Sequence, residues 1–423
     1  MRHLIVASVA LAGVATDVTA QSLADRVASA SQPRVQFTFS ARAEVCGNGR
    51  SYYQIAGNSW YGSYNEGDRR EPCVNGPVRV LLDRAGRDVI SISTFVGPLP
   101  EAVPGVADLG RVGTRDASEY LLGIAERGQG RVSRDAIMPA VLADSVDVTP
   151  RLLTIARNQN APRETRRSAI SWATRPLDTR ERNVRDIATA LVTIAGDEDE
   201  NHSVRQQALR GLARLEHGAG TTPLLDLARD ARRSWLAREA LTALNASGDP
   251  RARQYLREVV RAASMPDEAL ASAIRAVGGE YATGEDMRLL RETFSKLPGD
   301  RSRNAAVSAI ATFGGSDNLR WLLALAANPD EPAAVRRRAV QHAYKAGAAV
   351  ADLISIYDQT TDNNLKDAIL ATLVESGEKQ ATDKLMQIAR MDESPQRRRK
   401  AINLLSRSSD ERVKKFLQDL AGR

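Results

Sequence analysis

The pentapeptide Leu152-Leu-Thr-Ile-Ala156 recurs as Leu191-Val-Thr-Ile-Ala195, and this recurrence decides the fold of the chain. Looser copies begin 31 to 39 residues apart, at Leu121, Leu224, Leu256, Leu290, Leu322, Leu353, Leu385 and Phe416. Self-similarity at a period of about 20 to 50 residues is the signature of a repeat array. Positions 1, 2, 4 and 5 of the pentapeptide are apolar and share one helical face, so they predict a buried helix in each unit.

A second set of positions recurs with nearly the same period and predicts a second helix in each unit. A small residue there precedes a larger aliphatic one, and we call the small position the anchor. The anchor pairs are Ala136-Ile137, Ala169-Ile170, Ala208-Leu209, Ala240-Leu241, Ala273-Ile274, Ala306-Val307, Ala339-Val340, Ile369-Leu370 and Ala401-Ile402. Alanine at a packing point lets neighbouring helices approach closely. Two sets of apolar positions that recur with nearly the same period predict a stack of helix pairs.

This pattern resembles the HEAT-repeat family, including the short HEAT-like units of the phycobilisome-lyase type, over about residues 116–423. The resemblance implies a mainly α fold, a right-handed α-solenoid of about nine helix pairs. It also implies an acidic–basic pair that ties each inter-helix turn to the next unit. The basic positions are Arg166, Arg205, Arg303, Arg336, Lys366 and Arg398, and the acceptors in four units are Asn160, Asp199, Asp330 and Asp392.

Residues 1–20 predict a secretory signal peptide. Arg2 and His3 precede an apolar run from Leu4 to Ala15, and Val18-Thr-Ala20 offers small residues at a cleavage position. This order of charge, apolar core and small residues is typical of a cleaved signal. The apolar run is shorter than the roughly 20 residues that span a bilayer, and no later stretch is apolar enough to cross one. We therefore expect export to the periplasm or the extracellular space.

Residues 21–97 predict a small β-rich domain. Val35, Phe37 and Phe39 alternate with polar residues, which indicates a half-buried strand, and 78–83 and 88–96 predict two strands around a glycine turn. Cys46 and Cys73 are the only cysteines, and an even pair in an exported chain predicts a disulfide. The proline-rich segment 98–115 is interpreted as a linker to the solenoid at 116–423.

Five aromatic residues crowd into a short stretch of this domain: Tyr52, Tyr53, Trp60, Tyr61 and Tyr64. One interpretation is a platform that stacks on sugar rings or on peptide groups, because aromatic faces pack against apolar ligand surfaces. The alternative is that so small a domain needs its aromatic residues as a core. The first interpretation predicts cell-wall or carbohydrate binding.

The chain holds 59 Lys and Arg against 52 Asp and Glu, a formal net charge of +7. The HEAT resemblance implies that second helices line a concave binding face, which favours a protein partner, and an acidic one if that face is basic. The candidate partner-binding residues beside the anchors are Arg167, Arg210, Arg275, Arg337, Arg338, Arg399 and Lys400. The alternative is a solvated helical face with scattered counter-charges. Nucleic acid is not expected, because the chain is exported and no aromatic stacking series runs through the repeats.

No catalytic motif is found in the sequence. The four histidines lie far apart, and neither an HExxH, a GxSxG nor a phosphate-binding loop is present. The acidic run at 197–200 lacks the ligand spacing of a calcium loop. We therefore expect no cofactor, no metal and no enzymatic activity, and predict an exported scaffold. Some HEAT-like relatives are bilin lyases or isomerases, so the resemblance leaves a lyase-type or isomerase-type enzyme as an alternative.

Overall fold

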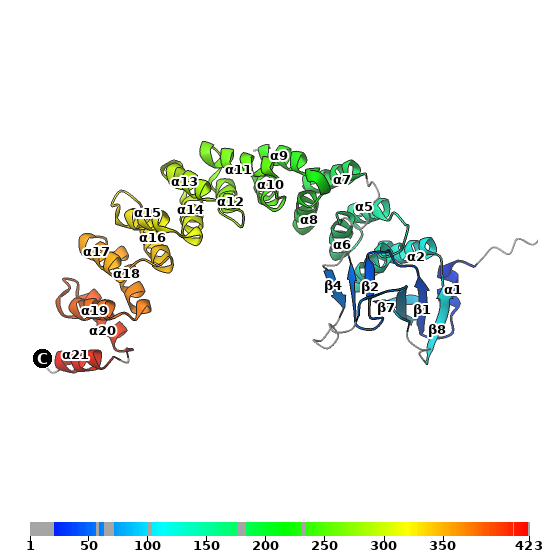
Figure 1. Ribbon diagram of the computed structural model, residues 1–423, viewed down its shortest axis with the longest axis horizontal. Coiled ribbons are helices and arrows are strands. Elements are labelled where there is room, and N and C mark those ends of the chain that lie inside the picture. The colour runs from blue at the N-terminus through cyan, green and yellow to red at the C-terminus, as the bar shows by residue number, and fades with distance from the viewer. Residues whose placement is uncertain are drawn as a thin grey trace, which may run out of the picture. The chain divides into compact units, whose positions relative to one another are not determined.

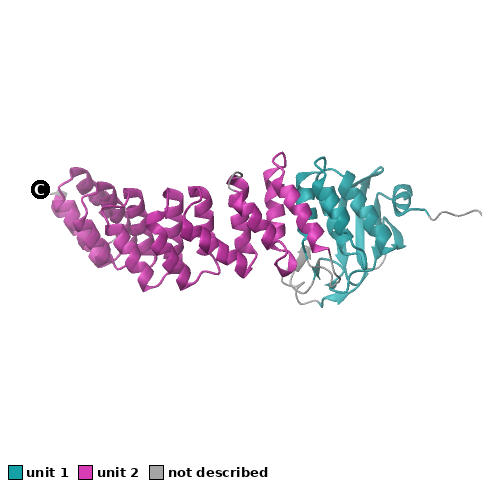
Figure 2. Cartoon of the chain, turned by 90° about the horizontal axis from the view of Figure 1, so that it is seen from above, with its two compact units in different colours: residues 1–181 teal, residues 182–423 magenta. Residues whose placement is uncertain are grey.

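The computed structural model describes residues 21–55, 59–62, 72–99, 104–175, 183–230, 234–408 and 410–421 of the 423-residue chain. The chain divides into two compact units, residues 1–181 and 182–423 (Figure 2). The described residues are mainly helical with a β-rich part near the N-terminus, as the sequence predicts. The predicted signal peptide, residues 1–20, lies outside the described residues.

The first unit contains two four-stranded sheets, with strand orders β7-β6-β1-β8 and β4-β3-β2-β5, and a group of helices. Its elements are α1 (Leu23–Ser29), β1 (Arg34–Phe39), β2 (Val45–Gly47), β3 (Tyr52–Ile55), β4 (Ser59–Gly62), β5 (Val74–Asn75), β6 (Val78–Ala85), β7 (Asp88–Val96), β8 (Val106–Arg111), α2 (Thr114–Arg127), α3 (Gly130–Asp135), α4 (Ile137–Val141), α5 (Thr149–Arg157) and α6 (Arg163–Ala173).

Strand β1 lies inside the larger sheet and carries much of its core. It pairs antiparallel with β6 and parallel with β8. Val35, Phe37 and Phe39 are fully buried, and the ring of Phe37 meets that of Tyr120 in α2 edge-on, with 6.2 Å between centroids. Gln36 on the opposite face is buried as well. The strand is therefore covered on both faces, not half-buried as its alternating pattern predicts.

The predicted disulfide is confirmed. Cys46 in β2 is bonded to Cys73, which directly precedes β5. Strands β2 and β5 are antiparallel neighbours, with Cys46 opposite Asn75. The bond therefore fastens β5, a strand of only two residues, to the smaller sheet.

The segment 98–115, interpreted from its sequence as a linker, contributes a strand to the larger sheet. Its residues Val106–Arg111 form β8, which pairs in parallel with β1. Arg26 of α1 also donates a hydrogen bond from Nη2 to the carbonyl oxygen of Leu109, at 2.6 Å. The linker interpretation is wrong for these residues, because their backbone is paired within the sheet.

Helices α2 to α6, expected as the start of the solenoid, belong to the first compact unit. Buried Arg42 donates from Nε to the carbonyl oxygen of Val141 at 2.7 Å and from Nη2 to that of Val146 at 2.6 Å. A backbone bridge between Ala41 and Ala143 adds to this contact. These contacts tie the chain that follows β1 to the end of α4. The compact unit therefore extends past residue 116, where the sequence predicted that the solenoid begins.

Replacing Arg84 with alanine is expected to release α1 from the first unit. The buried guanidinium donates to carbonyl oxygens at and beyond the end of α1, those of Val27, Ala28, Ala30 and Gln32. Carbonyls at a helix end have no partner inside the helix, and leaving buried ones unsatisfied costs about 1–3 kcal/mol each. We expect amide hydrogen exchange in residues 22–32 to accelerate at least tenfold, measured by mass spectrometry.

The matched control for this variant is Arg87→Ala. Arg87 is exposed in the turn between β6 and β7, and its removal breaks no such contact. Exchange in α1 should match the wild type in this control. Equal acceleration in both variants would show that Arg84 does not hold the helix.

The second unit is built of helix pairs in two layers. The second helices of the pairs, α8, α10, α12, α14, α16, α18 and α20, form the inner layer (Figure 1). The elements are α7 (Val184–Gly196), α8 (His202–Ala213), η2 (Glu216–Gly218), α9 (Thr221–Arg229), α10 (Ser234–Ala246), α11 (Pro250–Ala262), α12 (Asp267–Val277), α13 (Gly284–Thr293), η3 (Phe294–Lys296), α14 (Asp300–Phe313), α15 (Ser316–Ala327), α16 (Ala333–Lys345), α17 (Val350–Gln359), α18 (Asn363–Ser376), α19 (Lys379–Met391), α20 (Pro395–Leu405) and α21 (Glu411–Ala421).

The anchors behave as their periodicity predicts. All nine are 0% exposed, including Ala169 in the first unit and Ile369 in the second. Leu191, Ile194 and Ala195 of the recurring pentapeptide are buried on α7. Each second helix of the second unit packs against the next one, from α8 to α20. The two recurring positions are therefore core, and ligand contacts must come from other residues.

The basic residue before the anchor caps the preceding helix in three units. Two of the basic residues also pair with a carboxylate of the next unit, Arg303 with Glu331 at 3.0 Å and Arg336 with Asp362 at 3.8 Å. Nε of Arg166, Arg205 and Arg336 donates to the last-turn carbonyl of the first helix, at 3.0, 2.9 and 3.0 Å respectively. For Arg336 the acidic partner is Asp362 and not the predicted Asp330. Asp392 does accept a hydrogen bond, but from Nε of Arg397 at 2.9 Å. The carbonyl groups at a helix end have no partner inside the helix, and these guanidinium groups donate a hydrogen bond to one of them.

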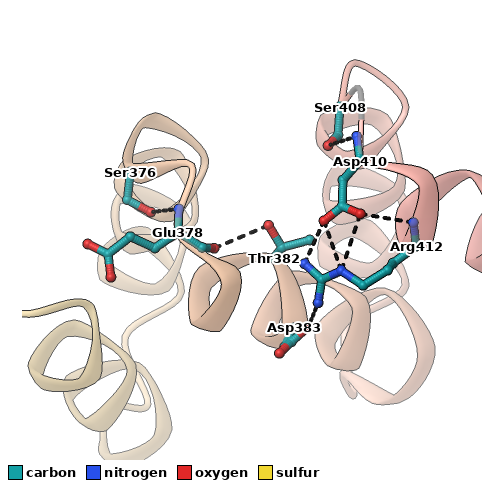
Figure 3. A network of polar contacts seen from close by, with 7 residues as sticks. All are labelled: Ser376, Glu378, Thr382, Asp383, Ser408, Asp410 and Arg412. Atoms are coloured by element: carbon teal, nitrogen blue, oxygen red, sulfur yellow. Dashed lines mark hydrogen bonds and ion pairs between the residues drawn. The ribbon is translucent and has the colours of Figure 1, made fainter.

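Three turns between consecutive pairs use a Ser-x-Asp or Ser-x-Glu motif, beginning at Ser247, Ser376 and Ser408, and its last copy is shown in Figure 3. The Oγ of Ser408 accepts from the backbone N–H of Asp410 at 3.2 Å, and Asp410 accepts from the N–H and the guanidinium of Arg412 (Figure 3). Arg412 also reaches Asp383 in the preceding pair, at 2.8 Å. The same arrangement joins Asp249 to Arg251, whose guanidinium holds the pKa of the Asp249 carboxyl well below its usual range.

Candidate functional site

The strongest concentration of unneutralised charge on the second helices lies on α16. Arg337, Arg338 and Lys345 are exposed on this helix, which contains no acidic residue. None of the three has an ion-pair partner among the described residues. The preceding second helix, α14, has uncharged Asn304, Ala305 and Thr312 at the positions one repeat earlier. We call Arg337, Arg338 and Lys345, together with Arg399 of α20, the basic surface.

The positive field of α16 acts on its own histidine. Burial lowers the pKa of His342 below its ordinary value, and the charges of Arg338 and Lys345 lower it further. A histidine with a lowered pKa is neutral at neutral pH, so it does not add to the charge there.

The seven basic residues expected at a binding face do not all belong to one surface. Arg167 lies in α6 of the first unit and pairs with Glu164 at 3.0 Å. Lys400 pairs with Asp367 of the neighbouring second helix at 2.9 Å. Arg275 is exposed and donates to Oγ of Ser272 at 3.0 Å. Arg210 is exposed on α8, three second helices before α14.

Other charges at the start of the second unit are paired. Arg238 of α10 contacts Glu239 at 3.3 Å and Glu268 of α12 at 3.0 Å. Gln206 of α8 donates to the carboxylate of Glu239 at 2.8 Å. This part of the second-helix layer matches the alternative of a solvated face with counter-charges. Arg337, Arg338 and Arg399 match the basic-surface interpretation.

Sequence reasoning missed Lys345, because only positions directly beside the anchors were considered. Lys345 lies seven residues after Arg338, which places both on the same side of an α-helix. The pairing of Lys400 was also missed. Its partner Asp367 lies one repeat period earlier, so comparing each charge with the residue one period away would have found it.

The prediction of an aromatic platform is wrong for Tyr53. Tyr53 is buried, and its hydroxyl lies 2.9 Å from the sulfur of Met138 in α4. The backbone register of β3 and β4 pairs Tyr53 with Tyr61. Successive residues of a strand point to opposite faces, so a run of aromatics along a strand does not form one surface. The side chains of Tyr52, Trp60 and Tyr61, and all of Tyr64, lie outside the described residues.

Two depressions in the second unit contain no acid–base pair. One, of about 210 Å³, is lined by residues that include Arg336 and Thr360. The other, of about 520 Å³, lies between α7 and α9 and includes Val192 and Pro223. No carboxylate or histidine lines either one. Within the described ranges, no group of three or more His, Cys, Asp or Glu is placed to hold a metal ion.

A membrane-crossing helix is likewise not found in the part of the chain that the structure describes. Its helices fall short of the length and hydropathy that a bilayer span requires.

Comparison with known proteins finds a match for one part of the second unit. Residues 188–278, which run from α7 to the end of α12, match the family model described as HEAT repeats. A solved structure of human deoxyhypusine hydroxylase in complex with glycerol is similar at 18% identity over 69% of this chain and 96% of that chain. Its TM-score of 0.24 is too low to carry an argument about fold or function. No curated protein matches the chain.

Proposed function

We propose that the protein is an exported, non-enzymatic scaffold that binds an acidic protein partner through the second helices of its HEAT repeats. In this proposal it forms a right-handed solenoid of about nine helix pairs. The observation that carries the proposal is the basic surface, where Arg337, Arg338, Lys345 and Arg399 present charge that no described carboxylate neutralises. HEAT repeats commonly mediate protein interaction, which supports a scaffold role.

The charges of the basic surface favour recognition of carboxylates. Arginine presents a planar fork that binds a carboxylate through two parallel hydrogen bonds. A cluster of one sign also speeds the encounter with an oppositely charged partner. Paired arginines such as Arg238 lack this capacity, because their guanidinium groups are already neutralised.

Export rests on residues 1–20 and is supported by the disulfide. Stable disulfides form in oxidising compartments and are rare in the cytosol. In this proposal the signal is cleaved after Ala20, so the mature chain begins at Gln21, directly before the serine cap of α1. Edman sequencing of the mature protein from the exported fraction tests this. An N-terminus at Met1 in that fraction would contradict it.

The test of the scaffold role is charge reversal on the basic surface. Replacing Arg337, Arg338 and Arg399 with glutamate is expected to abolish capture of the native partner in a cross-linking pull-down from the exported fraction. The wild-type interaction should weaken as salt rises toward physiological ionic strength, because exposed charges are screened over about 8–10 Å.

The matched control reverses three exposed arginines of the first helices, Arg261, Arg288 and Arg320. It changes the net charge of the chain by the same amount but leaves the basic surface intact. Partner capture should persist in this control. If both variants capture the partner equally well, the basic surface is not the binding site.

A further inference from the structure

The cavity beside Arg336 lies where two consecutive repeats meet. Its volume is about 210 Å³, and its lining includes Pro329 in the turn between α15 and α16, and Thr360 and Thr361 in the turn between α17 and α18. A single water molecule needs only about 10–15 Å³ of such a space. The cavity can therefore hold a polar group such as a carboxylate.

The guanidinium of Arg336 is buried but only partly hydrogen-bonded. Its Nε donates to the carbonyl oxygen of Ala326 at 3.0 Å and its Nη2 to the hydroxyl of Thr360 at 3.2 Å. Its Nη1 donates no hydrogen bond to any described residue, and Oδ2 of Asp362 lies 3.8 Å away, beyond hydrogen-bonding distance. Asp362 is held in this position because its Oδ1 caps α18, accepting from the backbone N–H of Asn364 at 2.8 Å.

The preceding repeat shows what completes such an arginine. Arg303 is the equivalent of Arg336, since both lie three residues before the anchor of their unit. Its Nε also donates to a backbone carbonyl, that of Leu297, at 3.2 Å. Its Nη1, however, donates to Oε2 of Glu331 at 3.0 Å. Glu331 is the residue directly before Pro332, the N-cap of α16.

The equivalent of Glu331 in the next unit is Thr361. The residue directly before the N-cap of a second helix is a glutamate in three units, at Glu200, Glu331 and Glu393. In α18 the N-cap is Asp362, so this position is Thr361, whose side chain is shorter and uncharged. Both Arg336 and Thr361 line the cavity. The cavity thus lies beside an arginine that has no counterpart of the Glu331 carboxylate.

Another unit also lacks the glutamate, and its arginine has a different partner. Arg205 is followed at this position of the next unit by Arg232, which lies outside the described residues. The guanidinium of Arg205 lies over the ring of Trp235, 4.4 Å from the centroid. No aromatic ring of the described residues lies over Arg336 in this way. The Arg336 cavity is therefore not closed by the arrangement found at Arg205.

We propose that the cavity beside Arg336 receives one carboxylate, from a glutamate or aspartate side chain of an acidic protein partner. This inference rests on the proposed function and names a contact of that partner. The guanidinium is already buried and held by two hydrogen bonds, so little ordering is needed when a carboxylate binds. A charge-assisted hydrogen bond to Nη1 would then replace the one that Glu331 makes in the preceding repeat.

A protein side chain is the favoured source because the cavity adjoins the basic surface. Arg337 and Arg338 follow Arg336 directly in α16, and both are exposed. An acidic segment held by these two arginines would place further carboxylates close to the cavity. A small free carboxylate would gain none of these additional contacts.

The test is a variant that supplies the carboxylate from within the chain. Thr361→Glu places a glutamate where the preceding repeat has Glu331, so it should pair with Arg336 and fill the cavity. Binding of a fluorescently labelled peptide of about eight glutamates to the full oxidised chain is followed by anisotropy at low salt. We expect the variant to bind at least about tenfold more weakly than the wild type, the effect of losing one hydrogen bond between charged groups. Circular dichroism and the urea midpoint should not fall, because Thr361 is exposed in a turn.

Two matched variants separate the cavity from general effects of charge. Asn364→Asp adds the same charge at an exposed position three residues further on, which is not part of the cavity lining. It should weaken peptide binding less than twofold. Thr361→Ser keeps the hydroxyl and leaves the cavity open, so it should bind the peptide as the wild type does.

Three outcomes would overturn the proposal: no binding of the peptide, equal weakening in Thr361→Glu and Asn364→Asp, and binding of free glutarate as tight as that of the peptide. The last would make the cavity a site for a small anion. Capture of the native partner distinguishes this failure from failure of the proposed function. If capture is lost on reversal of Arg337, Arg338 and Arg399 but persists in Thr361→Glu, the basic surface stands and the cavity contact does not. The opposite pattern would support the cavity and contradict the basic surface.

Discussion

Replacement of Asp286 by alanine is expected to lower the free energy of unfolding of the second unit by about 3–5 kcal/mol, the cost of breaking a buried ion pair. Asp286 is 0% exposed at the start of α13. Its carboxylate accepts hydrogen bonds from Nε of Arg257 at 2.6 Å and from the N–H of Thr283 at 2.8 Å, and Arg253 donates to it as well. Without the carboxylate, two arginines of α11 lose their counter-charge and α13 loses its capping box.

The charge and the hydrogen-bonding capacity of Asp286 can be separated by the Asp286→Asn variant. Burial opposes ionisation of this carboxyl, but hydrogen bonds from Arg257, Thr283 and Arg253 outweigh it and hold its pKa below the ordinary value. A lowered pKa in the folded state stabilises the fold above the unfolded value of about 3.9. That contribution is lost as the pH falls through the folded-state pKa. Below about pH 4 the difference in stability between wild type and Asp286→Asn should therefore shrink.

The measurement is urea unfolding of the full chain, followed by circular dichroism between neutral pH and about pH 3. The control is Asp317→Ala, because Asp317 pairs with Arg320 in a bridge whose side chains are 70% and 77% exposed. An exposed pair contributes at most about 1 kcal/mol. A similar small loss in both variants would contradict a structural role for the buried carboxylate.

The recurring apolar positions allowed the helical part of the fold to be predicted from sequence. Ala208 and Ala273 lie at helix contacts. Such contacts form within one repeat and with its neighbour, so small residues that recur at a fixed period predict them. Strand β8 was missed because it pairs with a strand from a distant part of the sequence. Its partner β1 lies far earlier in the chain, and a short segment between prolines and glycines carries no alternating pattern to announce a strand.

The boundary between units and the partners of individual charges were harder to predict. Arg42 joins the β-rich part to α4 through backbone carbonyls, and every residue has a carbonyl, so such contacts leave no mark in the sequence. The same applies to Arg166 and Arg336, whose guanidinium groups cap helix ends. Charges beside the anchors could be placed on the second helices, but whether each one is neutralised depends on side chains a full repeat away, as for Lys400.

Reduction of the Cys46–Cys73 disulfide is expected to destabilise the first unit by about 3.5 kcal/mol, from the loss of a constraint on the unfolded chain that closes a loop of 27-residue separation. The structure extends the affected region beyond the strands. Because Arg42 and the bridge from Ala41 to Ala143 tie the β-rich part to α4, helices α2 to α6 should lose protection together with the sheets. The second unit, which has its own core, should keep its stability.

Hydrogen exchange followed by mass spectrometry separates the two units in one experiment on the full chain, with and without reductant. Exchange should accelerate in residues 104–175 along with the strands, whereas 183–230 and 234–421 should retain wild-type protection. The Cys46→Ser/Cys73→Ser variant, in the absence of reductant, controls for effects of the reductant itself. Protection of α2 to α6 that survives reduction would mean that these helices fold independently of the sheets, as a boundary at residue 116 requires. Loss of protection throughout 183–421 would instead show that the two units unfold as one.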